Sequence, residues 1–328
     1  MFVVPDVDNG LHLINPNAPT NNHDFFALDG VAIRKYIVIQ EKYAWNHDGT
    51  DIDMIHPIGT ICHELGHVLG LPDLYDTSEN SASGIGEWGL MGSGNYLRQT
   101  SPAYMSAWSR YQLGYITPIV LSNIVANHTS ILSAEENQEA IAYILPLDSN
   151  MPQEYLILEN RQKVKSDRWL PESGLLVWHV DETITDMYPG LNSVNVNSNF
   201  YGVNLLQADG NGKLYTNCNI PNCADSGDPF KTNGLITGST NPNTDTYSYD
   251  RDADGIEEGG GDSSIEIREI QEQDGIINMI VDNRNVEGQI LSYDEGNYEA
   301  IAFPKIDNVL EWIGIRIVSP STSLLSGI

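Results

Sequence analysis

Basic side chains are scarce in this sequence: 16 Lys and Arg residues stand against 45 Asp and Glu residues, which gives a formal net charge of -29 over 328 residues. A protein that neutralises nucleic-acid phosphates, or that adheres to an anionic membrane, needs the opposite balance. We therefore expect neither nucleic acid nor a membrane surface as a partner. The charge itself is typical of a self-repelling, exported protein, and we expect a monomer.

Cysteine and long apolar runs are also scarce. Of three cysteines, Cys62 lies in an apolar helical pattern and is expected to be a buried small hydrophobic residue. Cys218 and Cys223 bracket a short loop, and the sequence leaves open whether they form a disulfide. No apolar run approaches the length that crosses a bilayer, and the first residues lack the pattern of a secretory leader. We expect a secreted protein whose leader has been removed, or a sequence that begins inside a longer gene product.

Hydrophobic residues make up 41% of the sequence, enough for a core, and their pattern changes along the chain. Before residue 118, the sequence predicts a strand over 34–40, a helix over 57–69, and a second helix over 104–113 with Ser101 as its N-cap. After residue 118, β-branched and alternating segments predict strands. The clearest are residues 140–145, 154–159, 174–180, 264–268 and 276–281. These patterns predict an α+β protein with a β-rich C-terminal half.

An H-E-x-x-H pattern at residues 63–67 carries the clearest chemistry. Residues of a helix advance by about 100°, so His63 and His67 lie on one side and can direct imidazole nitrogens at one metal ion. The apolar residues fall opposite, and we expect their side to be buried, with Gly59, Gly66 and Gly70 leaving room for a substrate beside the histidines. These apolar residues are Ile58, Ile61, Cys62, Leu65, Val68 and Leu69.

A catalytic zinc ion needs three protein ligands and one open position, so a third ligand must come from outside the helix. Gly70 permits the chain to reverse at the helix end, and the carboxylate of Asp73 follows at a suitable place. Asp76 is the alternative ligand. Glu64 points about 100° away from His63, which suits a general base that acts on a metal-bound water. Because short H-E-x-x-H patterns also occur by chance on amphipathic helices, the third ligand decides between the two interpretations.

The extended pattern from residue 63 to residue 73 resembles the zinc signature of metzincin peptidases, with Asp in place of the usual third His. Continued through residue 76, it is similar to the immune inhibitor A family of secreted bacterial metallopeptidases. Other segments resemble the same family, so that the similarity spans the chain from about residue 25 to residue 282. These segments are residues 88–94, 106–115, 155–162, 174–182 and 227–230.

The resemblance implies a metzincin-like catalytic domain and protein or peptide substrates. It implies a catalytic Zn²⁺ held by His63, His67 and Asp73, with Glu64 as the general base.

The resemblance also implies that Met91 forms a turn beneath the metal, where it packs without binding the ion. Some members of the wider clan have a tyrosine two residues after this methionine, whereas Ser93 stands here. The group that stabilises the oxyanion is therefore open, with Tyr96 as a candidate.

The family similarity also suggests a division of the chain. Residues 1–118 are expected to form the zinc-peptidase core, incomplete at its N-terminal end relative to the family, and residues 119–283 the β-rich part of the peptidase region. Residues 284–328 are expected to be a tail or the start of a further β module.

A long region rich in Asn, Asp and Gly covers residues 209–261. Within it Asp250, Asp252 and Asp254 alternate as at the start of a calcium-binding loop, but Gly261 stands where an EF-hand has its bidentate Glu. A structural Ca²⁺ and a solvated acidic turn both fit this pattern. Calcium would supply the ordering that such a long loop otherwise lacks.

Together these features predict a secreted, zinc-dependent metalloendopeptidase that hydrolyses peptide bonds in proteins. One alternative is a non-catalytic, calcium-ordered surface or adhesion protein that keeps a peptidase scaffold. Another is a zinc hydrolase that acts on a small amide or ester. Chelator-sensitive proteolysis separates the first prediction from the surface protein, and a panel of peptides and small amides separates it from the second alternative.

Overall fold

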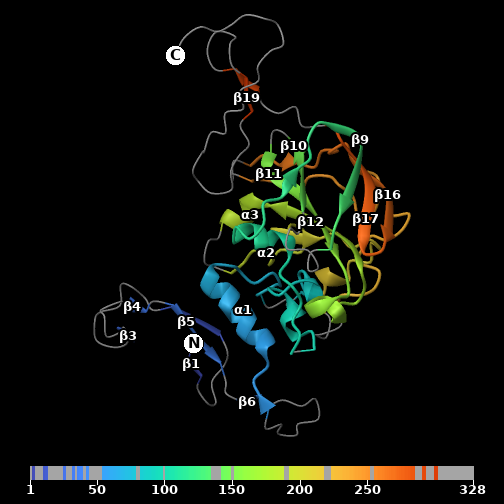
Figure 1. Cartoon of the computed structure of the whole chain (residues 1–328). Coiled ribbons are helices and arrows are strands. Elements are labelled where there is room, and N and C mark those ends of the chain that lie inside the picture. Colours follow the sequence, from blue (N-terminus) through green and yellow to red (C-terminus); the bar gives the residue numbers. More distant parts are fainter. Residues whose placement is uncertain are drawn as a thin grey trace, which may run out of the picture.

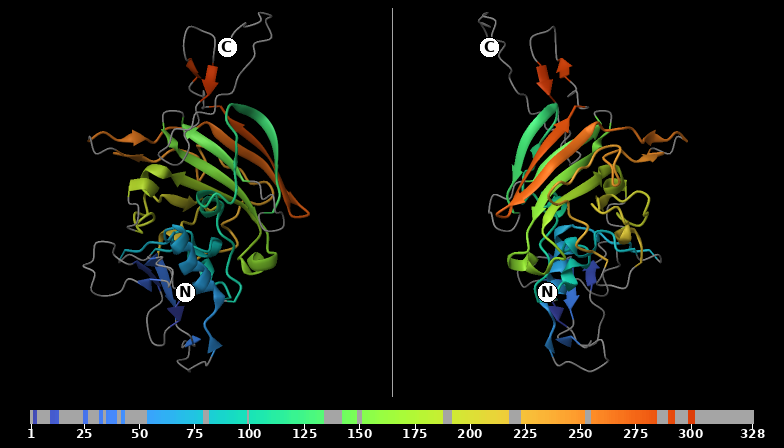
Figure 2. Two further views of the ribbon diagram at one scale, coloured as in Figure 1. Left: turned by 60° about the vertical axis from the view of Figure 1, so that its left-hand side comes forward. Right: turned by 90° about the vertical axis from the view of Figure 1, so that its right-hand side faces the viewer.

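A computed structural model describes residues 54–78, 82–98, 100–133, 142–148, 151–187, 192–217, 223–251 and 255–284, together with short strands outside these ranges. These residues combine helices and strands, in agreement with the predicted α+β class. A five-stranded sheet separates two layers, with a three-stranded sheet on one face and helices α1 and α2 on the other (Figures 1 and 2).

The five-stranded sheet has the order β13-β12-β11-β10-β8. Its strands are β8 (Ile119–Val120), β10 (Tyr143–Asp148), β11 (Met151–Arg161), β12 (Gly174–Asp181) and β13 (Val203–Leu205). β8 runs parallel to β10, and the other neighbours are antiparallel. Every residue of β12 is buried, as expected for a central strand that is covered on both faces.

The three-stranded sheet has the order β16-β17-β9 and is antiparallel. Its strands are β9 (Ile124–Ile131), β16 (Ile265–Gln273) and β17 (Ile276–Asn283). Asp274 and Gly275 connect β16 to β17 with positive φ angles of 54° and 77°, the backbone of a type I′ hairpin turn. β9 is an eight-residue strand that the sequence patterns did not predict, because polar residues interrupt its apolar ones.

The five-stranded sheet has two apolar faces because successive strand residues point to opposite sides. Leu156 and Leu158 face the three-stranded sheet, whereas Tyr155 and Ile157 face the layer that holds α1 and α2. The first core includes Leu145, Leu147, Leu175, Val177, Ile265, Ile267, Ile277, Met279 and Val281. The second includes Leu71, Leu74, Ile85, Trp88, Met91, Trp108, Leu176, Trp178 and Val180. The second core therefore joins residues from both sides of position 118.

Helix α1 (Ile58–Leu69) lies where the sequence predicts it and ends at Gly70, whose φ is 109°. The prediction of its buried side is wrong, however. Ile58, Leu65 and Leu69 are 53%, 49% and 46% exposed, whereas His63 and Glu64 on the other side are buried. The reason is that the loop carrying Met91 packs against this polar side of the helix. Cys62 is only partly buried, at the edge of the core that contains Met91.

Helix α2 (Ala107–Gln112) is shorter than predicted, and its N-cap is Ser106 rather than Ser101. The Ser106 hydroxyl accepts a hydrogen bond from the Ser109 N–H. The preceding residues are not helical because their backbone groups bind elsewhere: the Ala103 N–H donates to Gly94 O at 2.9 Å. The Tyr104 N–H donates to Asp167 at 2.8 Å. Tertiary hydrogen bonds thus override the local helix signal. Within the described residues, α3 (Glu182–Met187) and four 3₁₀ turns are the remaining helices. The turns are η1 (Gly86–Trp88), η2 (Ser93–Tyr96), η3 (Lys165–Trp169) and η4 (Lys213–Tyr215).

The predicted strand at 34–40 corresponds to β5 (Lys35–Ile39), which contacts α1. β5 pairs in parallel with β1 (Phe2–Val3) and antiparallel with β2 (Gly10–Leu13). The other short strands are β3 (Phe25–Phe26), β4 (Ala32–Ile33), β6 (Lys42–Tyr43), β7 (Met54–Ile55), β14 (Ser248–Tyr249), β15 (Glu258–Gly259), β18 (Ile290–Ser292) and β19 (Glu299–Ile301). Most of the predicted tail, residues 284–328, lies outside the described residues.

Two further sequence predictions concern the membrane and the cysteines. Among the described residues, no helix is both long and apolar enough to span a bilayer. Cys223 is disulfide-bonded and Cys62 is a free thiol, while Cys218 lies outside the described residues.

Candidate metal centre

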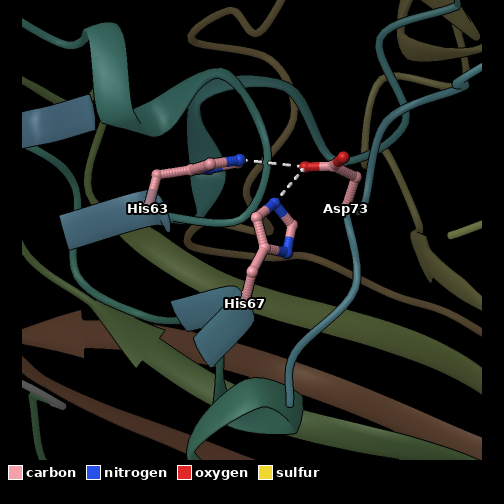
Figure 3. Close-up of side chains that lie close together, drawn as sticks. All are labelled: His63, His67 and Asp73. Carbon is pink, nitrogen blue, oxygen red and sulfur yellow. Dashed lines mark ion pairs between the residues drawn. The ribbon is translucent and has the colours of Figure 1, made fainter. Parts of the chain in front are cut away.

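His63 and His67 on α1 and Asp73 after the helix converge on one point (Figure 3). The Oδ1 atom of Asp73 lies 2.9 Å from His63 Nε2 and 3.2 Å from His67 Nε2. The two imidazole rings are perpendicular, with centroids 4.8 Å apart, so their nitrogens approach the carboxylate from different directions. Within the described residues, this is the one group of three or more His, Cys, Asp or Glu side chains whose ligand atoms come close enough to hold a metal.

Backbone carbonyls fix the orientation of both imidazoles. His63 Nδ1 lies 2.9 Å from Leu90 O, and His67 Nδ1 lies 2.8 Å from Leu71 O. A carbonyl only accepts hydrogen bonds, so each Nδ1 carries the hydrogen, and in the neutral ring Nε2 then presents a lone pair. This is the arrangement of metal-binding histidines, in which the second ring nitrogen is held by a carbonyl or carboxylate. Both rings therefore direct Nε2 at the same point as Asp73.

The carboxylate of Asp73 is buried, and its two oxygens have different surroundings. Asn192 Nδ2 donates a hydrogen bond to Oδ2, whereas the buried Oδ1 has no hydrogen-bond donor when both Nε2 atoms are unprotonated. Burial alone would raise the pKa of Asp73, but when the two histidines are protonated their hydrogen bonds and charge hold it well below its ordinary value. A buried anionic oxygen that faces two imidazole nitrogens fits a divalent cation between the three atoms.

The end of α1 delivers Asp73 to this point. The Leu71 N–H donates to Gly66 O and the Gly70 N–H to His67 O, both at 3.0 Å, which closes the helix with Gly70 in the left-handed conformation. The chain then turns back beside the helix. Asp76, the alternative ligand in the sequence prediction, is not part of the metal group: its Oδ1 accepts the Ser78 N–H at 2.8 Å.

Met91 is buried and packs against α1 at Gly66. A Cβ at Gly66 would lie 2.5 Å from Met91 Sδ, so the absence of a side chain at Gly66 admits the methionine against the helix. The space predicted for a substrate at this glycine is thus filled by Met91. The Met91 carbonyl also accepts the Leu74 N–H at 2.9 Å, which ties this turn to the segment that carries Asp73.

Three further side chains surround the metal group. Glu64 is buried on α1, and its charge acts on His67 and on Tyr75. Tyr75 stacks on His63, with ring centroids 6.4 Å apart, and lies close enough to Asp73 for the charge of this carboxylate to act on it. Burial, followed by the charge of Asp73, raises the pKa of Tyr75 far above its ordinary value, so that its phenol stays protonated. Tyr96, the predicted oxyanion candidate, lies close enough to influence Tyr75 and is exposed.

Buried Arg161 on β11 holds the loop that leads to Met91. Its guanidinium binds both oxygens of Asp167 at 2.6 Å. It also donates to Trp88 O at 3.0 Å and to Tyr104 O at 3.2 Å. The fork of an arginine suits this task, because its donors can bind a carboxylate and two carbonyls at once.

Glu159, two residues earlier on the same strand, fixes α2. Its Oε1 accepts from Arg110 Nη2 at 2.7 Å. Its Oε2 accepts from the Ala107 N–H at 3.1 Å and from Trp178 Nε1 at 2.8 Å. The family-like segments at 106–115, 155–162 and 174–182 therefore meet at one buried carboxylate.

Two more buried carboxylates tie the same loop to residues 223–228. Trp88 Nε1 donates to Asp228 Oδ2 at 2.8 Å, and the Ala224 N–H donates to Glu87 Oε2 at 3.0 Å. Burial raises the pKa of Glu87 to about 7 and that of Asp228 to about 6, against the opposing effect of these hydrogen bonds. Neighbouring acidic groups, including Asp225 beside Asp228, contribute to both of these increases after burial.

The predicted calcium residues lie in a different part of the protein. Asp250 Oδ2 accepts the Gly255 N–H at 2.8 Å, while Asp252 and Asp254 lie outside the described residues. The neighbouring Arg251 forms ion pairs with the buried carboxylates of Glu154 and Asp181. These contacts anchor the start of the acidic loop to the five-stranded sheet.

Sequence reasoning missed Asn192 and Tyr75 as neighbours of the metal group. Asn192 is 119 positions away from Asp73, and an asparagine in a loop gives no signal of what it will contact. Tyr75 stands inside the family-like string, but no spacing rule relates it to His63.

Comparison with known families agrees with the motif analysis. Residues 24–118 match the family model described as the immune inhibitor A peptidase M6 catalytic domain. No curated protein matches the chain. The match confirms the family resemblance over residues 24–118, and this range includes the whole of the metal group. Residues 24–118, which carry His63, His67 and Asp73, therefore resemble the catalytic domain of the immune inhibitor A peptidases of family M6, and this match supports a metallopeptidase.

Proposed function

We propose that this chain is a secreted, zinc-dependent endopeptidase in which His63, His67 and Asp73 bind the metal and Glu64 is the general base. The observation that carries the proposal is the convergence of two carbonyl-oriented Nε2 atoms and a buried Asp73 Oδ1 on one point. Two nitrogens and one carboxylate oxygen are a ligand set that catalytic zinc uses. The remaining coordination position is then open to water or substrate.

Zinc in such a site lowers the pKa of water toward about 7 and polarises a carbonyl. The residues of the chain supply the rest of the chemistry. Glu64, adjacent to His63 on α1, accepts a proton as water attacks the scissile carbonyl, and returns that proton to the departing amine. Tyr75 keeps its phenolic proton and is a hydrogen-bond donor beside Asp73. His63 and His67 stay oriented by Leu90 O and Leu71 O throughout.

The test compares wild type with Glu64→Gln, which keeps the size of the side chain and removes the base. Glu269→Gln is the matched control, because Glu269 lies exposed on β16. We expect zinc bound by all three proteins, casein hydrolysis by wild type and by Glu269→Gln, and at least a hundredfold lower rate for Glu64→Gln. Equal hydrolysis by Glu64→Gln and wild type would contradict the role of Glu64.

The same measurement, extended from casein to peptides and small amides, separates the alternative functions. Zinc binding without hydrolysis of casein, peptides or small amides favours a non-catalytic scaffold, and hydrolysis of small amides alone favours a small-molecule hydrolase. Secretion and calcium binding by Asp250, Asp252 and Asp254 are parts of the proposal that rest on composition and pattern. Calcium binding is tested by calcium-dependent thermal stability, measured with and without chelator and at constant zinc.

A further inference from the structure

Asn192 contacts Asp73 with both ends of its amide. Asn192 Nδ2 donates to Asp73 Oδ2, and the Asp73 N–H donates to Asn192 Oδ1 at 2.5 Å. Asn192 belongs to a segment that leads to β13 of the five-stranded sheet, far in sequence from the helix and loop that carry the metal group. One side chain therefore fixes both the backbone and the carboxylate of the same residue.

The pair of contacts controls which oxygen of Asp73 faces the histidines. With Oδ2 occupied by an amide donor, the carboxylate cannot rotate without losing a hydrogen bond, and Oδ1 remains directed at His63 Nε2 and His67 Nε2. A buried carboxylate that lost this donor would leave an oxygen unsatisfied, which is costly in a water-poor site. Partners that hold metal ligands in this way typically change metal affinity by tenfold to a hundredfold.

The backbone at Asn192 is suited to this position. Its φ is +53°, in the left-handed region, where asparagine is accepted more readily than most residues. Its carbonyl accepts a hydrogen bond from Thr77 Oγ1 at 2.7 Å. Three residues later, buried Asn195 donates from Nδ2 to Leu74 O at 3.0 Å and to Val203 O at 2.8 Å. The segment is thus tied to the chain around Asp73 at several points.

The hydrogen bonds between Asn192 and Asp73 are not needed to hold the segment in place. Asn195, Thr77 and the backbone hydrogen bonds already hold the segment against the loop. The contacts of Asn192 Nδ2 and Oδ1 go only to Asp73 among the hydrogen bonds of the described residues. Their effect is therefore on the ligand itself.

We infer that Asn192 is a positioning residue that presents Asp73 to the metal through a single oxygen, so that residues outside 24–118 complete the metal centre. This inference rests on the proposed zinc function and deepens it. It predicts that the side chain of Asn192 sets the affinity for zinc more than the stability of the metal-free protein.

The experiment uses the full chain and measures zinc affinity by competition with a chromophoric zinc chelator. Asn192→Gly removes the amide and keeps the left-handed backbone accessible. Asn233→Gly is the matched control, since Asn233 also has a positive φ, +67°, but is exposed in a loop beside β16. Asn192→Asp keeps the acceptor for the Asp73 N–H and replaces the donor with a second carboxylate. Urea unfolding of the metal-free proteins is measured in parallel.

We expect zinc dissociation constants 10- to 100-fold higher for Asn192→Gly and Asn192→Asp than for wild type, with Asn233→Gly within twofold of wild type. If Asn192→Gly fails to fold, Asn192→Asp alone decides. Dissociation constants within twofold of wild type for a folded Asn192 variant overturn the inference and leave the zinc function intact. An equal loss in Asn233→Gly also overturns it. Wild type that binds no zinc overturns both.

Discussion

The two layers that cover the five-stranded sheet are ordered in different ways. The outer layer, β9, β16 and β17, is an antiparallel sheet whose two ladders each contain one register shift, and its core is mainly aliphatic. The layer that carries the metal group has two helices, 3₁₀ turns and irregular loops, and much of its order comes from buried polar side chains of the rest of the chain. Arg161, Glu159, Asp228 and Asn192 all lie outside residues 24–118. The layer that carries the metal group therefore depends on residues outside 24–118 for more than apolar burial.

Arg161→Met should show the difference between the two layers most strongly. It leaves Asp167 buried without its partner and frees Trp88 O and Tyr104 O, so we expect the free energy of unfolding to fall by about 3–5 kcal/mol. Arg268→Met on β16 is the control, since Arg268 is partly exposed and its ion pairs are worth about 1 kcal/mol or less. Urea unfolding at pH 7 measures both. Similar losses in the two variants would contradict the contrast between the layers.

Zinc should stabilise the metal-bearing layer directly. At free zinc one hundred times its dissociation constant, the wild-type chain should gain about 2.7 kcal/mol and a higher melting temperature. His67→Ala removes one of three ligands and should lose most of this gain, while its stability with chelator changes little. A zinc-induced shift that survives in His67→Ala would place the stabilising ion elsewhere.

Glu87→Gln tests the buried carboxylates that tie the loop before Met91 to residues 223–228. Because burial raises the pKa of Glu87 from 4.5 to about 7, the folded protein binds this proton more tightly than the unfolded chain does. The contribution of protonated Glu87 to the free energy of unfolding is therefore complete below pH 4.5. This contribution, at most about 3 kcal/mol, is lost as pH rises through about 7. Glu87→Gln keeps an acceptor for the Ala224 N–H and should flatten this part of the profile of unfolding free energy against pH. An unchanged slope between pH 5 and pH 8 would refute this account of Glu87.

Gly66→Ala should have the smallest effect, about 1–2 kcal/mol of destabilisation, because the new methyl group meets Met91 Sδ at 2.5 Å while alanine favours the helix. Shortening the methionine in Gly66→Ala/Met91→Ala should make the two changes less than additive. Thermal unfolding of the four proteins of this cycle measures the coupling. Strict additivity would show that the two side chains do not compete for the same space.

Local patterns predicted α1, its end at Gly70, and the strands that became β5, β10, β11, β12, β16 and β17. They did not predict which side of α1 is buried, because Ile58, Leu65 and Leu69 resemble a core stripe while Met91 packs on the opposite side. They also misplaced the start of α2, because Asp167 and Gly94 bind backbone groups of residues that favour a helix locally.

The metal group itself was predictable because His63, His67 and Asp73 lie within one helix and its end, where spacing determines geometry. Its supporting contacts were not, since Asn192 binds Asp73, and Arg161 and Asp228 bind the loop at Trp88, only through the tertiary fold. Spacing rules carry information over a few turns of chain, and a contact across 119 positions is outside their range.

The most direct test of the central claim is the anomalous difference density of zinc-soaked crystals of the full chain, recorded above and below the zinc absorption edge. We predict one strong peak bonded to His63 Nε2, His67 Nε2 and Asp73 Oδ1, at about 2.0–2.2 Å from each. Zinc bound without Asp73, or no peak between the two histidines, would contradict the account.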